Sequence, residues 1–187
     1  MKNTFLLLGI TAILSSCSQP APQEKAAMVD SSSVSITRGE YLVNTSGCHD
    51  CHSPKMMTDK GPVPDPALLL SGHPQNLPLP GSDTATSNHW ILFHMGGTAA
   101  KGPWGTSFAA NLTPDPTGLG NWSEEQFFNA MRKGYYKGIE GGRMLLPLMP
   151  WPAYAQMTDE DLRSIFAYLK SLPPVKNIVP APLPPGA

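Results

Sequence analysis

The stretch Cys48-His49-Asp50-Cys51-His52 determines how the rest of this sequence is interpreted. It is a C-x-x-C-H sequence, in which two thiols three positions apart can each form a thioether bond to the same porphyrin. The histidine that follows directly is then placed to supply an axial ligand to the iron. The pattern therefore predicts a covalently attached haem c, with Cys48 and Cys51 as attachment sites and His52 as an axial ligand.

The same five residues admit three other interpretations, each of which needs support that the rest of the sequence lacks. A redox dithiol of the thioredoxin type expects a βαβ pattern, which is not apparent. A structural zinc site normally draws on a second ligand pair, and no second C-x-x-C follows. A disulfide between cysteines this close gains little loop-closure entropy. We therefore interpret the motif as a haem-attachment site.

Composition indicates one domain with a few helices and long turns. The chain has 187 residues and a formal net charge of −1 at pH 7, which gives no sign of a nucleic-acid partner. Its 21 prolines and 17 glycines are many for a compact helical domain, so turn-rich connections are expected. A covalently attached haem would supply apolar surface on which such connections can pack.

The first residues resemble the export signal of a bacterial lipoprotein. Lys2 precedes an apolar run from residue 5 to 14, and Leu14-Ser15-Ser16-Cys17 resembles a lipobox, in which the signal is cleaved before the cysteine and that cysteine is acylated. An ordinary secretory signal with an incidental cysteine is the alternative. We predict a signal over residues 1–16, lipid attachment at Cys17, a flexible tether over residues 17–33, and a location on the periplasmic side of a bacterial membrane.

Three helices are predicted from capping residues and apolar spacing. The first is capped by Thr37 and contains Gly39, where a glycine would let another helix approach closely. The second is capped by Ser123 and ends at Gly134, a residue type that favours helix termination. The third begins at Thr158 and stops before the prolines at 173 and 174.

The long connection between the motif and the second of these helices has a different character. Residues 53–121 hold most of the prolines and no convincing long helix. We expect this segment to wrap around the haem, with short helical or strand pieces inside it. The domain is predicted over residues 34–176, followed by a Pro-rich tail over residues 177–187.

A low-spin electron carrier needs a sixth iron ligand, usually a methionine sulfur or a second imidazole. Met149 is the preferred candidate, because the prolines around it have fixed φ angles that would hold its side chain in place. A core methionine in a Pro-rich turn is the plainer reading of the same residue. The other candidates that we weigh as ligands are Met95, Met144 and His94. His73 and His89 stand in polar, turn-rich contexts and are expected at the surface.

Together these residues resemble class I-type cytochrome c domains, and more closely the cytochrome c subunits that accompany periplasmic dehydrogenases of alcohols, sugar acids and aldehydes. The resemblance covers about residues 36 to 176. The segments that carry it, beside the C-x-x-C-H motif, are Arg38-Gly39-Glu40-Tyr41-Leu42-Val43, Asn111-Leu112-Thr113-Pro114-Asp115, Gly118-Leu119-Gly120-Asn121-Trp122-Ser123, Met149-Pro150, Met157-Thr158-Asp159-Glu160-Asp161-Leu162, Ala167-Tyr168-Leu169 and Leu172-Pro173-Pro174-Val175.

This resemblance implies an all-α cytochrome c fold in which the first and last helices cross beside a single haem. It implies His52 and Met149 as the axial pair. In relatives a proline carbonyl steadies the ligating imidazole, and Pro62 is the candidate for that role here. The segment around Asn111 and Thr113 is a candidate for binding the haem propionates.

The function expected from this reading is transfer of single electrons between periplasmic redox partners, without catalysis of a substrate reaction. A dehydrogenase is the expected donor, and a terminal oxidase or another cytochrome is the expected acceptor. A five-coordinate haem protein that acts as a peroxidase or gas sensor is the first alternative, and it would require an open iron site. A haem-free zinc module is the second.

Overall fold

The computed structural model describes residues 34–81 and 83–186. The predicted signal, the tether and Cys17 lie outside these residues. Of the helices within the described ranges, none has the length and apolar character needed to cross a membrane.

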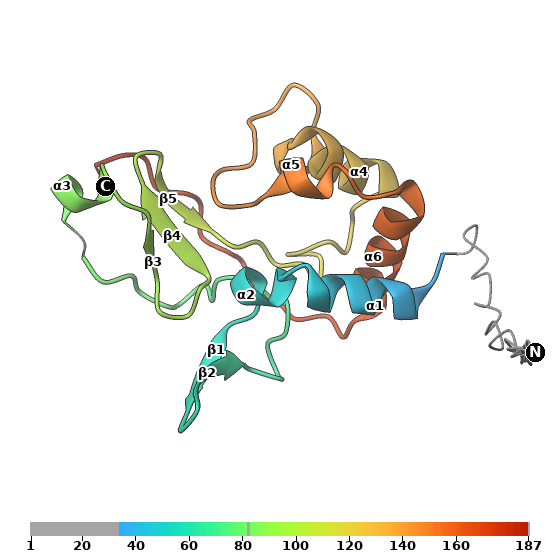
Figure 1. Cartoon of the computed structure of the whole chain (residues 1–187), viewed down its shortest axis with the longest axis horizontal. Helices are drawn as coiled ribbons and strands as arrows, with labels where there is room; N and C mark the ends of the chain where they lie inside the picture. The colour runs from blue at the N-terminus through green and yellow to red at the C-terminus, as the bar shows by residue number, and fades with distance from the viewer. Residues whose placement is uncertain (1–33, 82, 187) are drawn as a thin grey trace, which may run out of the picture. The chain divides into compact units, whose positions relative to one another are not determined.

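Two helices from the ends of the domain cross, as the resemblance to cytochrome c domains implies. Helix α1 (Ile36–Thr45) and helix α6 (Asp159–Ser171) pack against each other (Figure 1). Helix α6 begins at the predicted cap, because the Thr158 hydroxyl accepts a hydrogen bond from the backbone of Asp161. Helix α1 begins two residues earlier than predicted. Its cap is Ser35, whose hydroxyl accepts from the backbone N–H of Arg38.

The crossing depends on Gly39, and the predicted close approach is confirmed. A methyl group built on Gly39 would lie 1.9 Å from the carbonyl oxygen of Ser164 in α6. No side chain fits in that space, so the two backbones meet directly. Ser164 also accepts a hydrogen bond from the backbone N–H of Ser35 through its hydroxyl, at 3.1 Å. A salt bridge of 2.9 Å between Arg38 and Asp161 spans the same crossing at the surface.

The hydrophobic core is built on this crossing. Its buried members come from α1, from α6, from helix α4 and from two loops, and they are Leu42, Val43, Leu70, Leu119, Phe127, Met131, Leu162, Ile165 and Leu169. Several half-buried side chains pack against this cluster, including Cys48 of the motif and Met149. The core therefore reaches the segments that were predicted to hold the haem.

Helix α4 (Glu124–Lys133) follows the prediction closely. The Ser123 hydroxyl accepts from the backbone of Gln126, and the Gln126 side chain accepts from the backbone of Ser123, which completes a capping box. The helix ends at Gly134, whose φ of 71° is in the left-handed region. A 3₁₀ turn, η1 (Tyr136–Gly138), and the short helix α5 (Trp151–Tyr154) pack beside α4.

The prediction of an all-α fold is wrong. The segment after the motif contains two small antiparallel sheets as well as the short helix α3 (Thr84–Ser87). Strands β1 (Lys55–Thr58) and β2 (Gly61–Pro64) form a hairpin. Strands β3 (Leu92–Phe93), β4 (Ala99–Gly102) and β5 (Gly105–Phe108) form a three-stranded sheet in that order (Figure 1).

The bounds and pairing of these strands were not predicted, because each has only two to four residues. A run this short carries no clear alternation of apolar and polar side chains, and its stability comes from pairing across a turn. The turn signals themselves were visible. Gly105 has a φ of 96° just after the turn between β4 and β5, where Gly102 pairs with Gly105. The expectation of short helical or strand pieces in this segment is confirmed.

The end of the chain is joined to the rest of the domain through Asn177, the first residue of the predicted tail. Asn177 is 6% exposed, and its side chain donates to the carbonyls of Ser71 and His73 and accepts from the backbone of Gln75. Further along, the backbones of Leu183 and Thr106 exchange two hydrogen bonds.

Candidate haem-binding site

The C-x-x-C-H residues form their own short helix, α2 (Cys48–His52). Gly47 precedes it with a φ of 73°, and this left-handed residue lets the chain turn from α1 into α2 without a break in packing. Both cysteines are free and half-buried. Because they lie three positions apart on a helix, their sulfur atoms are on one side of it.

Burial raises the pKa of the Cys48 thiol to about 11, and burial also raises the pKa of Cys51. Both groups are therefore neutral thiols at pH 7. Thiolates are the reactive form in disulfide exchange, so these cysteines are poorly suited to thioredoxin-type chemistry.

The ring of His52 is held by the backbone of a distant segment. Its Nδ1 lies 2.7 Å from the carbonyl oxygen of Ala110. A carbonyl can only accept, so Nδ1 carries the proton and Nε2 keeps its lone pair for a metal. Burial lowers the pKa of His52, which favours the neutral imidazole that binds iron. This is the outer-shell contact expected for a metal-binding histidine.

The residue that makes this contact differs from the predicted one. Ala110 supplies the carbonyl, whereas Pro62 lies in β2, opposite Met57 in the hairpin. No local pattern identifies Ala110, since any residue can offer a carbonyl oxygen and 58 positions separate it from His52.

The carbonyl groups at the end of α2 accept hydrogen bonds from the side chain of Lys55 and from the backbone of Gly72. Lys55 Nζ donates to the carbonyls of His49, Asp50 and Ser53, at 2.8, 3.1 and 2.6 Å. The backbone N–H of Gly72 donates to the carbonyl of His52 at 2.8 Å. Three carbonyls of α2 and that of Ser53 therefore have partners outside the helix, although the helix has only five residues.

The loop that carries Met149 is held at two points, one next to α2 and one in β5. Tyr154, in α5, donates its hydroxyl to the carbonyl of Ser46, two residues before Cys48, at 2.7 Å. The Ser107 hydroxyl donates to the carbonyl of Pro147. Met149 itself is half-buried and packs against the same core cluster as Cys48.

Residues 107–110 link the two halves of this site. Ser107 contacts the Met149 loop, and Ala110 contacts His52. Four consecutive residues span roughly 10 Å between first and last Cα even when fully extended. The Met149 loop and the imidazole of His52 are therefore attached to a single short stretch of chain, which the sequence alone did not indicate.

The alternative sixth ligands occupy more open positions. Met95 is 82% exposed and Met144 is 43% exposed. His94 is half-buried, and its Nδ1 accepts from the backbone of Gly96 at 3.2 Å. The expectation that His73 lies at the surface is wrong. His73 is fully buried between Thr98 and Leu77, because its two ring nitrogens find partners in the loop that surrounds it.

Asn111 and Thr113 were candidates for binding haem propionates, and the structure places both in an internal network. The Asn111 carbonyl oxygen accepts from the backbone and the hydroxyl of Thr113, and its amide donates to the carbonyl of Val175. Thr113 is fully buried and accepts from the backbone of Val175. Their contacts hold the end of the chain against the loop that precedes α4.

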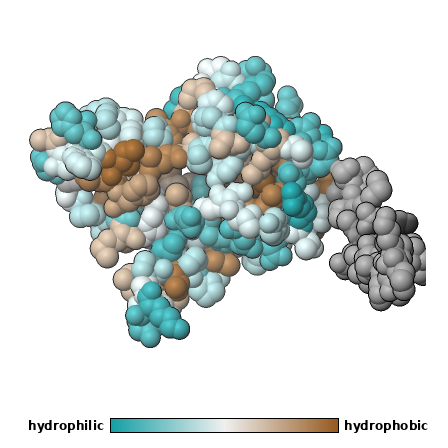
Figure 2. All heavy atoms as spheres, viewed as in Figure 1, coloured by the Kyte–Doolittle hydropathy of each residue, from teal (hydrophilic) through white to brown (hydrophobic). Residues whose placement is uncertain are grey.

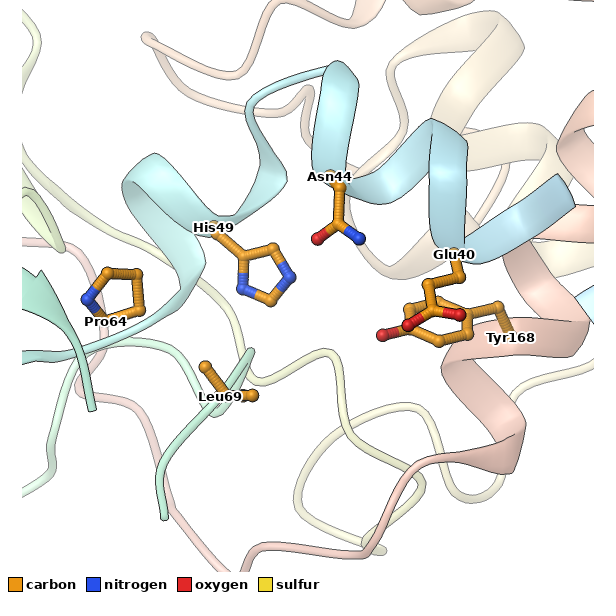
Figure 3. Close-up of a pocket in the computed structure, with 6 residues that line it drawn as sticks. All are labelled: Glu40, Asn44, His49, Pro64, Leu69 and Tyr168. Carbon is orange, nitrogen blue, oxygen red and sulfur yellow. The ribbon is translucent and has the colours of Figure 1, made fainter. Parts of the chain in front are cut away.

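A pocket of about 380 Å³ lies beside α1 and α2 (Figure 3). Its walls are Glu40, Asn44, His49, Pro64, Leu69 and Tyr168. His49 is the only residue of the motif among them. The predicted iron ligands do not line this pocket, so it is distinct from the candidate haem site.

The donor set fits a haem c. Two free thiols and an imidazole with an open Nε2 are adjacent on one helix. The loop that carries the Met149 side chain is attached to Ser46, just before this helix. The zinc alternative finds no support within residues 34–81 and 83–186, where no three or more His, Cys, Asp or Glu side chains are grouped to hold a metal ion.

Comparison with known proteins shows similarity to cytochrome subunits of dehydrogenases. The chain is 31% identical over 140 residues to the cytochrome c subunit of a quinone alcohol dehydrogenase from Gluconobacter oxydans, covering 74% of this chain and 22% of that protein. It is 31% identical over 167 residues to the fructose dehydrogenase cytochrome subunit of Gluconobacter japonicus, covering 89% and 26%. It is 32% identical over 134 residues to the gluconate 2-dehydrogenase cytochrome c subunit of Pantoea cypripedii, covering 71% and 22%.

The chain spans about a quarter of the length of these relatives. No protein-family model matches it. The similarity is to subunits named for their cytochrome, that is, to electron-transfer subunits rather than to the catalytic subunits of these dehydrogenases.

Proposed function

We propose that this protein is a c-type cytochrome that binds one haem and carries single electrons between redox proteins. The observation that carries the proposal is the His52 imidazole, which follows two unpaired thiols on the same short helix. The Ala110 carbonyl engages its Nδ1, so that Nε2 is free. The similarity to dehydrogenase cytochrome subunits supports the same function.

A haem bound here supplies a one-electron iron couple, and the residues of this chain determine its properties. Cys48 and Cys51 would hold the group covalently, and His52 would provide one ligand to the iron. Met149 would provide the second ligand; its half-buried position against the core cluster that Cys48 also contacts, and a loop held by Ser107 and Tyr154, support this role. Thioether ligation and an apolar surrounding both favour the ferrous state and raise the reduction potential.

The similarity supports a proposal for the partners, and the sequence of the first residues supports one for the location. The electron donor is a dehydrogenase, like the alcohol, fructose and gluconate dehydrogenases named for the relatives, and the acceptor is another cytochrome or a terminal oxidase. The protein is held at the periplasmic side of a bacterial membrane through a lipid at Cys17, which the lipobox-like Leu14-Ser15-Ser16-Cys17 supports.

The optical spectrum of the full chain, produced in a host that matures c-type cytochromes, tests this function. A six-coordinate low-spin spectrum in both oxidation states, unchanged by carbon monoxide, is expected. In Met149→Ala the far-red band of methionine-ligated ferric haem should disappear and carbon monoxide should bind. Met144→Ala is the matched control, since Met144 is 43% exposed and should leave the spectrum unchanged.

Two outcomes would contradict the proposal. A purified protein without covalently bound haem would refute the cofactor. A high-spin spectrum in the unmodified protein, with immediate carbon monoxide binding, would indicate an open iron site and thus a peroxidase or gas sensor in place of an electron carrier.

A further inference from the structure

We propose that Lys55 is a positioning residue of the haem site: it holds the end of the haem-attachment helix and places a positive charge there that raises the reduction potential. This inference rests on the proposed function, since it concerns a haem attached to α2. It goes beyond that function by assigning a role to a side chain that belongs to neither the motif nor the axial pair.

The geometry of the Lys55 ammonium is specific. Nζ donates to three carbonyl oxygens, those of His49, Asp50 and Ser53, at 2.8, 3.1 and 2.6 Å. An ammonium group has three N–H donors and no acceptor, so these three oxygens match its full capacity. Lys55 is half-buried, and its backbone lies at the start of β1, where it pairs with Pro64.

The position of this charge on α2 suits its sign. The last carbonyls of a helix have no partners within it, and they form the negative end of the helix dipole. Two of the three acceptors, His49 and Asp50, belong to α2, and the third follows directly after it. Lys55 therefore acts as a cationic cap at the end of the helix where His52 is located.

Ser53 reinforces the same arrangement. It is fully buried, and its hydroxyl lies 2.7 Å from Nδ1 of His49 and accepts from the backbone of Leu70 at 2.9 Å. The carbonyl of Ser53 faces Lys55. The turn between α2 and β1 is thus held on one side by Lys55 and on the other by the loop at Leu70, which leaves the His52 backbone little freedom.

The electrostatic consequence follows from the charge of the iron couple. Oxidation adds one positive charge to the haem, so a nearby cation disfavours the ferric state and raises the reduction potential. The carboxylate of Asp50 is exposed on the same helix and opposes this effect through solvent. Lys55 is the better shielded of the two charges, because it is half-buried and its ammonium donates to three carbonyls, whereas Asp50 is exposed.

Potentiometric titration of haem-loaded variants of the full chain tests the proposal. Lys55→Gln removes the charge but keeps hydrogen-bond donors, Lys55→Met removes both, and Lys55→Arg keeps the charge. The matched control is Lys60→Gln, which removes one positive charge from an exposed position in the turn of the same hairpin.

Both neutral variants at Lys55 should shift the equilibrium toward the oxidised form about tenfold, which corresponds to a potential about 59 mV lower for one electron. Lys55→Arg should stay close to the unmodified protein. The shift in Lys55→Gln should persist at 1 M salt, whereas any shift in Lys60→Gln should vanish there. The haem-loaded fraction is measured in each case, so a lower yield leaves the potential readable.

The inference is overturned if Lys55→Gln has the potential of the unmodified protein, or if Lys55→Arg falls as far as Lys55→Gln. In the latter case Lys55 acts through its shape alone. These results differ from failure of the proposed function, which shows as absence of covalent haem from the unmodified protein.

Discussion

Replacement of Gly39 by alanine tests the crossing of α1 and α6, on which the core beside the candidate haem site is built. The added methyl carbon would lie 1.9 Å from the carbonyl oxygen of Ser164, 2.5 Å from its carbonyl carbon and 2.8 Å from the Cβ of Tyr168. Ordinary van der Waals contact begins at 3.4 Å, so the helices would have to separate by about 1.5 Å at this point. Two of the three obstacles are backbone atoms, which cannot rotate away.

The expected free-energy change combines two opposing terms. Alanine in a helix interior is favoured over glycine by about 1 kcal/mol. Overpacking against a rigid neighbour costs about 3 kcal/mol, at the upper end of the usual range because backbone is involved. We therefore expect Gly39→Ala to lower the free energy of unfolding by about 2 kcal/mol.

Urea unfolding of the haem-loaded protein, followed by far-ultraviolet circular dichroism, measures this change. Thr37→Ala is the matched control, since Thr37 is exposed on the same helix and gains helix propensity without meeting a neighbour. It should be neutral or slightly stabilising. If Gly39→Ala proves as stable as Thr37→Ala, the backbones of α1 and α6 are not in direct contact and the reasoning fails.

Three further outcomes are expected. Asn177→Ala removes donors from the carbonyls of Ser71 and His73 and should lower the free energy of unfolding by about 1–3 kcal/mol in urea titrations; no change would show that the end of the chain contributes nothing to stability. Ser123→Ala removes a capping-box hydroxyl and should lower the free energy of unfolding in urea by about 1 kcal/mol. An unchanged free energy of unfolding would show that the capping box is not formed. Burial lowers the pKa of His73 in the folded state, so as pH falls below about 6.5 the unfolded chain takes up a proton that the folded protein does not, and stability is lost. The difference in unfolding free energy between the unmodified protein and His73→Gln should therefore shrink from pH 7 to pH 5. A constant difference would contradict the prediction that His73 stays neutral in the folded protein.

The helices of this protein could be predicted from sequence because their signals are local. The hydroxyls of Ser123 and Thr158 bond to backbone groups three residues on, and Gly134 provides the left-handed end of α4. The start of α1 was misplaced by two residues because Ser35 and Thr37 are both competent caps. Ser35 is the cap because the backbone N–H of Ser35 donates to the hydroxyl of Ser164 where the two helices cross.

The strands and the outer contacts of the site could not be predicted in the same way. The sheets form by pairing between segments too short to carry a pattern, which is why an all-α fold was expected. A basic side chain shortly after a helix is a known capping signal, so Lys55 could have been suspected from sequence, but its three acceptors could not.

By itself, the sequence determined the chemistry of the attachment site. Two thiols and an imidazole within five residues have their relative positions set by a single helical turn, whatever surrounds them. The tertiary structure alone decided which carbonyl orients His52 and which loop stands beside it. These contacts are made by Ala110, Ser107 and Tyr154, whose hydrogen-bond partners lie between 40 and 108 positions away in the sequence. Contacts of that separation depend on how the whole core closes, and no local spacing of residues encodes them.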